Sequence, residues 1–411
     1  MTVQDAALAA LDPEAIARDT AALVRVPSLT GDERPALELL AELAEGLGLQ
    51  ADLHRHDLEA LRAHPGHPGE EAERTELHGQ TVTLPGGDPG GPRIALDGHV
   101  DVVGPGEAPW ERDPFSGDRE GGFVHGRGAA DMKGGVVAAL HALGAIARTV
   151  GAAPGDVVLL AVGSEEDGGL GTFAALERDD RFDACLIAEP TDFDVVCAQA
   201  GALTFTGVVR GRSAHAALRL EGESAIDRYV AIHGALAEHE RAVNAGVTHP
   251  LMRELELPYP ISVGRLEAGT WSSSVPDLLR FEGRVGVKVG ERPQDARAAL
   301  EAAVPGAEIS WTGGAFAPGE TPGDHPWVRH VQAAAGVDGP RAPRLVGSPY
   351  GTDMRLFTER GIPTVLCGTG GIERAHAVDE RVAEADLVRL ARTIVRITLG
   401  PMVGGAAAAG R

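Results

Sequence analysis

The sequence predicts an α/β protein in which a domain with a mostly parallel sheet is interrupted by a smaller, inserted α+β domain. Its 411 residues exceed what a single hydrophobic core usually organises. Short apolar runs at residues 157–162 and 184–188 flank a helix-like stretch, and this strand–helix–strand order is typical of parallel sheets. After about residue 203 the runs alternate between apolar and polar residues, which indicates half-buried strands of a different domain.

The first predicted elements are two helices within residues 13–49, where apolar residues recur at helical spacing on either side of a turn at 27–32. Residues 60–92 are rich in His, Pro, Gly and Glu, which predicts an irregular excursion. A buried strand at 93–103 and a helix at about 132–150 follow.

The insert is predicted to combine alternating strands with two helices, near 222–243 and 293–303. Its strands are expected at 203–210, 261–266 and 279–289. The chain then resumes with a helix, a strand at 363–367 and a closing helix near 380–399, and the low-complexity tail 402–411 is expected to be mobile. We therefore predict a discontinuous larger domain, residues 1–203 and 317–411, around an inserted domain of residues 204–316.

Charge and cysteine content narrow the class of protein. The 37 basic and 60 acidic side chains give a formal net charge of -23, which would repel nucleic acid and anionic membranes. Small molecules or metal cations are the expected ligands. Cys185, Cys197 and Cys367 form no C-x-x-C pair, so we expect reduced thiols and a cytoplasmic location. No apolar run is long enough to span a bilayer, and the start of the chain does not resemble an export signal.

Polar residues follow the first buried strand directly. His99 and Asp101 stand two residues apart and project to the same face while the strand persists, so one could bind a metal and the other orient it. By itself an H-x-D pair is more often a structural histidine beside a solvated aspartate. Asp131 stands where a helix begins, and a helix N-cap is the ordinary explanation for it.

Further acids follow the next strands. Glu165 and Glu166 belong to three consecutive carboxylates whose repulsion favours a nearby cation, although a solvated acidic turn is the alternative. Glu189 follows the next buried run, and His376 stands in a loop after the strand at 363–367. The carboxyl ends of strands are where open α/β sheets build their sites. Histidine and carboxylates without thiolates suit zinc, cobalt or manganese, and a bridging carboxylate can hold two ions about 3.5–4 Å apart.

The candidate residues stand in five motifs, which follow one another along the chain in the order GHVD, GRGAADMKGG, GSEEDGG, AEPTD and AHAVDE. This ordered set resembles the motifs of the two-zinc aminoacylases, acetylornithine deacetylases, succinyl-diaminopimelate desuccinylases and glutamate carboxypeptidases. The resemblance covers about residues 15–399.

The resemblance implies a zinc-peptidase-like catalytic domain that holds two divalent metal ions, zinc first among them. It assigns His99 and Glu189 to one ion and Glu166 and His376 to the other. Asp131 would bridge the ions, Asp101 would orient His99, and Glu165 would be the general base. Three carboxylates against two divalent cations leave one positive charge, which a bridging hydroxide can neutralise.

The inserted domain of the family usually forms a lid and a dimer interface. His215 resembles the histidine that reaches a neighbouring active site and stabilises the tetrahedral oxyanion, although outside the family it would be an ordinary surface histidine. The family's usual carboxylate-binding positions are replaced here by residues 272–276 and 284–286. Arg280, Arg284 and Arg355 remain candidates, each more typical of a surface cation.

The function expected from these observations is metal-dependent removal of an acyl group, of the acetyl, succinyl or formyl type, from a small N-acylated amino acid or amine. A dipeptidase or carboxypeptidase with the same metals is the closest alternative, and a non-catalytic metal-binding protein is a more distant one. A serine hydrolase is disfavoured because no G-x-S-x-G elbow is present. The histidines His54, His56, His64, His67 and His78 could suggest a further metal site, but their irregular spacing predicts a solvated loop.

Overall fold

The computed structural model describes residues 2–401, so the tail 402–411 lies outside the described residues. Within it the chain forms two compact units. The first contains residues 2–197, 320–346 and 356–401, and the second, which we call the insert unit, contains 198–319 and 347–355. Residues 347–355 group with the insert, whereas the sequence analysis placed them in the larger domain. The predicted bounds of the catalytic and the lid or dimerisation domain remain a prediction.

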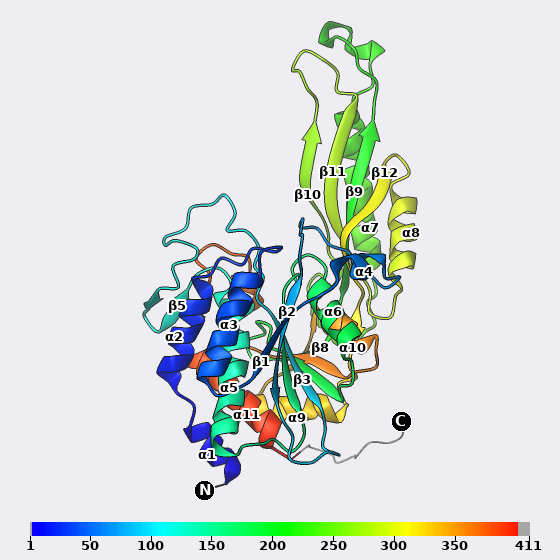
Figure 1. Cartoon of the computed structure of the whole chain (residues 1–411). Helices are drawn as coiled ribbons and strands as arrows, with labels where there is room; N and C mark the ends of the chain where they lie inside the picture. Colours follow the sequence, from blue (N-terminus) through cyan, green and yellow to red (C-terminus); the bar gives the residue numbers. More distant parts are fainter. Residues whose placement is uncertain (1, 402–411) are drawn as a thin grey trace. The chain divides into compact units, whose positions relative to one another are not determined.

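A large, mostly parallel sheet organises the first unit, as the sequence predicted (Figure 1). Strands β6, β3, β7 and β15 are adjacent and parallel, and antiparallel strands flank them. All six residues of β3 and of β6 are buried, as expected for strands covered on both faces. The nine strands are β1 (Ala51–Arg55), β2 (His78–Leu84), β6 (Val157–Val162), β3 (Ile94–His99), β7 (Ala184–Ile187), β15 (Thr364–Leu366), β8 (Val195–Gln199), β13 (Gly319–Glu320) and β14 (Leu345–Ser348).

Helices cover both faces of this sheet. Asp97 of β3 accepts a hydrogen bond from Thr172 of α6, whereas a side chain at the next position, Gly98, would meet Met132, just before α5, and Val136 in its first turn. Because successive strand residues face opposite sides, α6 and α5 lie on opposite faces. The helices of this unit are α1 (Val3–Ala9), α2 (Pro13–Val24), α3 (Arg34–Gly46), α4 (Leu58–Ala63), α5 (Gly134–Thr149), α6 (Leu170–Arg178), α9 (Pro326–Gly336) and α11 (Glu384–Leu399).

Shorter elements complete this part of the chain. The segment η1 (Ala129–Lys133) precedes α5, and η4 (Ile372–Arg374) precedes the loop that carries His376. A three-stranded sheet contains β4 (Arg119–Glu120), β5 (Phe123–His125) and β16 (Arg381–Ala383). Helix α10 (Met354–Thr358) spans the boundary between the two units.

The insert unit is an antiparallel sheet backed by helices. Its strand order is β10 (Ile261–Ala268), β11 (Leu278–Val287), β9 (Gly201–Arg210) and β12 (Glu308–Phe316). Phe205 and Phe281 from neighbouring strands meet edge to face in a core that also buries Leu300 of α8. The helical elements are α7 (Ala225–Asn244), α8 (Pro293–Ala303), η2 (Ala216–Glu221) and η3 (Met252–Glu254). This α+β architecture confirms the predicted class.

The prediction of one irregular excursion over residues 60–92 was wrong for residues 78–84. Residues 78–84 form β2, which pairs with both β1 and β6 inside the large sheet. The run HGQTVTL ends in alternating threonine and apolar residues, which is a strand pattern, but the Gly- and Pro-rich segments on either side obscured it.

Candidate metal centre

The predicted site residues of the first unit meet at one edge of its large sheet. His99 ends β3, Glu165 and Glu166 follow β6, and Glu189 follows β7. These strands are parallel neighbours, so their carboxyl ends share an edge. Asp131 joins them from η1, and His376 joins from the loop after β15. The alternatives of an isolated N-cap or a solvated acidic turn do not describe this arrangement.

His99 presents its Nε2 atom to the acids. Its Nδ1 lies 2.9 Å from the main-chain oxygen of Asp101, which can only accept, so Nδ1 carries a proton and Nε2 is the nitrogen available to a metal ion. Nε2 lies 3.1 Å from Oδ1 of Asp131 and 3.8 Å from Oε1 of Glu189. The side chain of His99 is 1% exposed, so solvent does not compete for this nitrogen.

The Asp101 carboxylate holds the neighbouring acidic turn. It accepts the main-chain N–H groups of Glu165 and Glu166, each at 3.2 Å, and the hydroxyl of Thr30 at 3.2 Å. Its nearest carboxylate oxygen is 3.5 Å from Nδ1 of His99, farther than its own main-chain oxygen. Asp101 therefore links His99 to the Glu165–Glu166 turn, and contacts His99 chiefly through its backbone.

His376 closes the other side of the cluster. Its Nε2 lies 3.1 and 3.0 Å from the two carboxylate oxygens of Glu166 and 3.7 Å from Oδ2 of Asp131. His376 has a φ of 58°, in the left-handed region that non-glycine residues rarely adopt. Its side chain is 53% exposed, so this is the solvent-facing side of an otherwise buried group.

Burial and the charges of neighbouring side chains determine which residues of the cluster carry a proton. Burial opposes charge on His99, but its hydrogen bonds with Asp101 and Asp131 prevail and hold the pKa of His99 well above its ordinary value. Burial raises the pKa of the Glu166 carboxyl, although His376 opposes the shift. The hydrogen bond of Glu166 raises the pKa of His376. In the absence of a cation, the cluster thus keeps protons that a bound cation would displace.

The donor set fits divalent cations. Ligand atoms of His99, Glu165 and Glu189 lie within 4.8 Å of one another, and so do those of His99, Asp131 and Glu166. Imidazole nitrogen and carboxylate oxygen without thiolate suit zinc, cobalt or manganese. Bringing four carboxylates together in a buried place is costly unless cations offset their repulsion. Glu165 belongs to one of the two groups, so the geometry admits it as a ligand as well as a base.

Two residues to which the sequence analysis gave no role support Asp131. Glu380 is buried, and one of its carboxylate oxygens accepts the main-chain N–H groups of Ala130 and Asp131, at 2.9 and 3.1 Å. Its other oxygen accepts from Arg127 at 2.6 Å. Glu380 stands four residues after His376 in the AHAVDE motif, but that spacing does not indicate hydrogen bonds to the main-chain N–H groups of Ala130 and Asp131.

The predicted residues of the insert unit are in a different environment. His215 is exposed, and its Nδ1 accepts the N–H of Ala217 at 3.1 Å. Arg280 and Arg284 are exposed, as expected for surface cations. The same expectation was wrong for Arg355, which is 1% exposed and lies 4.4 Å from the ring centroid of Phe316.

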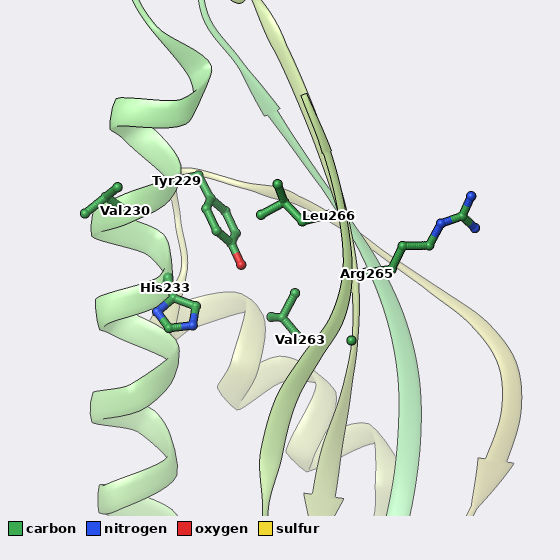
Figure 2. A pocket seen from close by; sticks show the side chains of 7 residues that line it. Tyr229, Val230, His233, Val263, Arg265 and Leu266 are labelled. Atoms are coloured by element: carbon green, nitrogen blue, oxygen red, sulfur yellow. The ribbon is translucent and has the colours of Figure 1, made fainter. Parts of the chain in front are cut away.

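The insert unit also has an apolar hollow of about 430 Å³ between α7 and β10. Figure 2 shows Tyr229, Val263 and Leu266 around this hollow, with Arg265 pointing away from it. Val230 on α7 is 67% exposed and Leu266 on β10 is 49% exposed. β10 is an edge strand, so its outer side has no strand partner within the insert sheet.

Comparison with known proteins agrees with the motifs. Residues 95–399 match the model of peptidase family M20/M25/M40. The chain is 33% identical over 393 residues to a succinyl-diaminopimelate desuccinylase of Methylobacterium sp. (strain 4-46), and the match covers 91% of this chain and 93% of that protein.

Solved structures show the same fold. An M20 family metallo-carboxypeptidase from Sulfolobus solfataricus superposes with a TM-score of 0.74 at 18% identity, over 92% of this chain and 97% of that one. A Bacillus subtilis protein described as a dinuclear metal-binding peptidase superposes with a TM-score of 0.60 at 18% identity, over 94% and 98%. Among residues 2–401, no helix combines the length and apolar character that a membrane crossing requires.

Proposed function

This chain belongs to peptidase family M20/M25/M40, and within it we propose a deacylase that removes an acetyl, succinyl or formyl group from a small N-acylated amino acid or amine. Membership makes the chain a metallohydrolase of amide or peptide bonds. The observation that carries the proposal is the cluster of imidazoles and carboxylates at one edge of the large sheet.

We propose that the cluster holds two divalent cations, with zinc preferred over cobalt or manganese. His99 and Glu189 would hold one ion, Glu166 and His376 the other, and Asp131 would bridge them. The short approaches of His99 and His376 to the two oxygens of Asp131 support the bridging role. When bound, such ions polarise a carbonyl and lower the pKa of water.

We assign both proton transfers of the hydrolysis to Glu165. Its carboxylate would take a proton from the attacking water, whose oxygen adds to the acyl carbon. As the C–N bond breaks, the same carboxyl would return the proton to the departing nitrogen, leaving a carboxylic acid and an amine. Glu165 is buried and its N–H is fixed by Asp101, which supports a defined position for this exchange.

The acyl group is the least constrained part of the proposal. Similarity to a succinyl-diaminopimelate desuccinylase at 33% identity supports an acylated amine with a carboxylate nearby. A dipeptidase or carboxypeptidase is the second candidate, supported by the carboxypeptidase of the same family and fold. The buried Arg355, which lies 3.6 Å from a carboxylate oxygen of Asp353, stays one of the candidate partners for a substrate carboxylate that the sequence named.

A substrate panel tests the proposal. Zinc- and cobalt-loaded enzyme is assayed against formyl, acetyl and succinyl derivatives of one amine, and against dipeptides. We expect kcat/KM to be highest for one acyl derivative. A higher value for the dipeptides would replace the deacylase with the peptidase, and no hydrolysis of any amide by metal-loaded enzyme would overturn both.

We further propose a homodimer that forms through the insert unit. The edge strand β10, the exposed Val230 and Leu266, and the hollow between α7 and β10 together support a second copy of this chain as the partner. In that dimer, His215 would act on the active site of the partner. A cytoplasmic location remains part of the proposal, because all three cysteines are buried, free thiols.

A further inference from the structure

His54 and His56 do not lie in a solvated loop, contrary to the sequence-based expectation. They belong to and directly follow β1, and as residues two apart they share one face of that strand. His78, on β2, pairs with Arg55 and therefore faces the opposite side. The two imidazoles touch, with ring centroids 4.8 Å apart and ring planes at 80°.

The Nε2 atoms of both rings are buried and have no hydrogen-bond partner. Buried polar atoms without a partner are uncommon in native proteins and often mark an ion or a water. Nδ1 of His54 lies 2.9 Å from the main-chain oxygen of Asp52, so it carries the proton and leaves a lone pair on Nε2. This arrangement, with one ring nitrogen donating to a carbonyl and the other bare, is typical of metal-binding histidines.

Both free nitrogens face the space above one glycine. A Cβ at Gly79 would lie 2.7 Å from Nε2 of His56 and 3.3 Å from Nε2 of His54. The missing side chain therefore leaves a small cradle between the two nitrogens. Burial lowers the pKa of His56 to about 4, so this ring is neutral at pH 7 and able to act as a ligand.

We propose that His54 and His56 form a second metal site, separate from the cluster around Asp131, that takes one imidazole-preferring divalent cation such as Zn²⁺. Two protein nitrogens are fewer than the four ligands of a closed structural zinc site, so we expect this ion to be exchangeable.

The test counts ions on the full-length chain after equilibrium dialysis against buffered Zn²⁺. We expect the double variant His54→Gln/His56→Gln to bind one ion fewer per chain than the unmodified protein. His78→Gln, a histidine on the opposite face of the same strand pair, is the matched control and should bind the same number. Circular dichroism and retained hydrolysis show that the variants are folded.

Gly79→Ala provides an independent check, because it fills the cradle and keeps both histidines. It should also lose one ion per chain. Equal zinc content in the double variant and the unmodified protein would overturn the site and leave water as the occupant of the cradle. Repeating the count in an Asp131→Ala background separates this outcome from a failure of the proposed catalytic centre.

Discussion

The cluster at the sheet edge and the segment around His215 both carry predicted catalytic residues, but they are held very differently. His99 and Asp131 are both buried. The ring N–H of His99 donates to the main-chain oxygen of Asp101, and the main-chain N–H of Asp131 donates to Glu380. His215 is exposed and its ring accepts one main-chain N–H. The first region is organised for chemistry before any ligand arrives, whereas the second requires a further surface to fix its histidine.

The largest effect should come from the centre of the cluster. Asp131→Ala removes the carboxylate proposed to bridge both ions, so we expect turnover to fall to the background rate and metal content to drop. Elemental analysis and kcat measure this. Asp97→Asn, a buried carboxyl on the same strand as His99 that hydrogen-bonds Thr172, is the control and should keep its metal. If the Asp131→Ala enzyme kept its activity, the cluster would not be the site of the reaction.

Glu165→Gln should separate ligation from proton transfer. The amide keeps the size of the side chain but cannot take a proton, so we expect kcat to fall by about 10²–10⁴ while both ions remain bound. Kinetics and metal analysis on the same sample make the distinction. Loss of an ion would instead show that Glu165 is a ligand, as its place beside His99 and Glu189 allows.

His215→Ala should weaken catalysis less, and without loss of metal or stability, because its side chain is exposed. Removing one donor to a developing oxyanion typically lowers kcat by about 10²–10³. Mixing His215→Ala with Glu165→Gln tests action between subunits, because a mixed dimer would contain one complete site, with Glu165 from the His215→Ala chain and His215 from the Glu165→Gln chain. A mixture that stays inactive despite demonstrated subunit exchange would exclude action in trans.

The sequence predicted the parallel sheet and the residues that meet at its edge because both depend on local patterns. Buried runs followed at once by His99, Glu165 or Glu189 can be recognised without a structure. The support of Asp131 by Glu380 could not, since it joins residues distant in the chain by hydrogen bonds to main-chain N–H groups. Arg355 was misjudged for a similar reason, because the burial of a cation depends on partners that are distant in sequence.

Of the four substitutions considered for the catalytic residues, Asp101→Asn should have the smallest effect on activity. The family resemblance implies that this side chain orients His99, but the shorter contact of His99 is with the main-chain oxygen of Asp101, which the substitution leaves in place. The carboxylate instead accepts the N–H group of Glu165 through Oδ1 and that of Glu166 through Oδ2, and asparagine replaces one of these two oxygens by an NH2 group that cannot accept. Loss of a residue that supports metal ligands usually costs about 10–100-fold in metal affinity or activity, and we expect the lower end.

Zinc affinity and kcat, measured on the same Asp101→Asn preparation, show which contact matters. If Asp101 acts mainly through the acidic turn, kcat should fall more than zinc affinity, because Glu165 loses its fixed position while His99 keeps its hydrogen bond. A fall in zinc affinity with kcat unchanged in the fully loaded enzyme would show the reverse. The carboxylate of Asp101 would then act mainly by orienting His99. In that case the cluster would differ from the exposed His215 because its imidazole is held in place, and not because Asp101 fixes the Glu165–Glu166 turn.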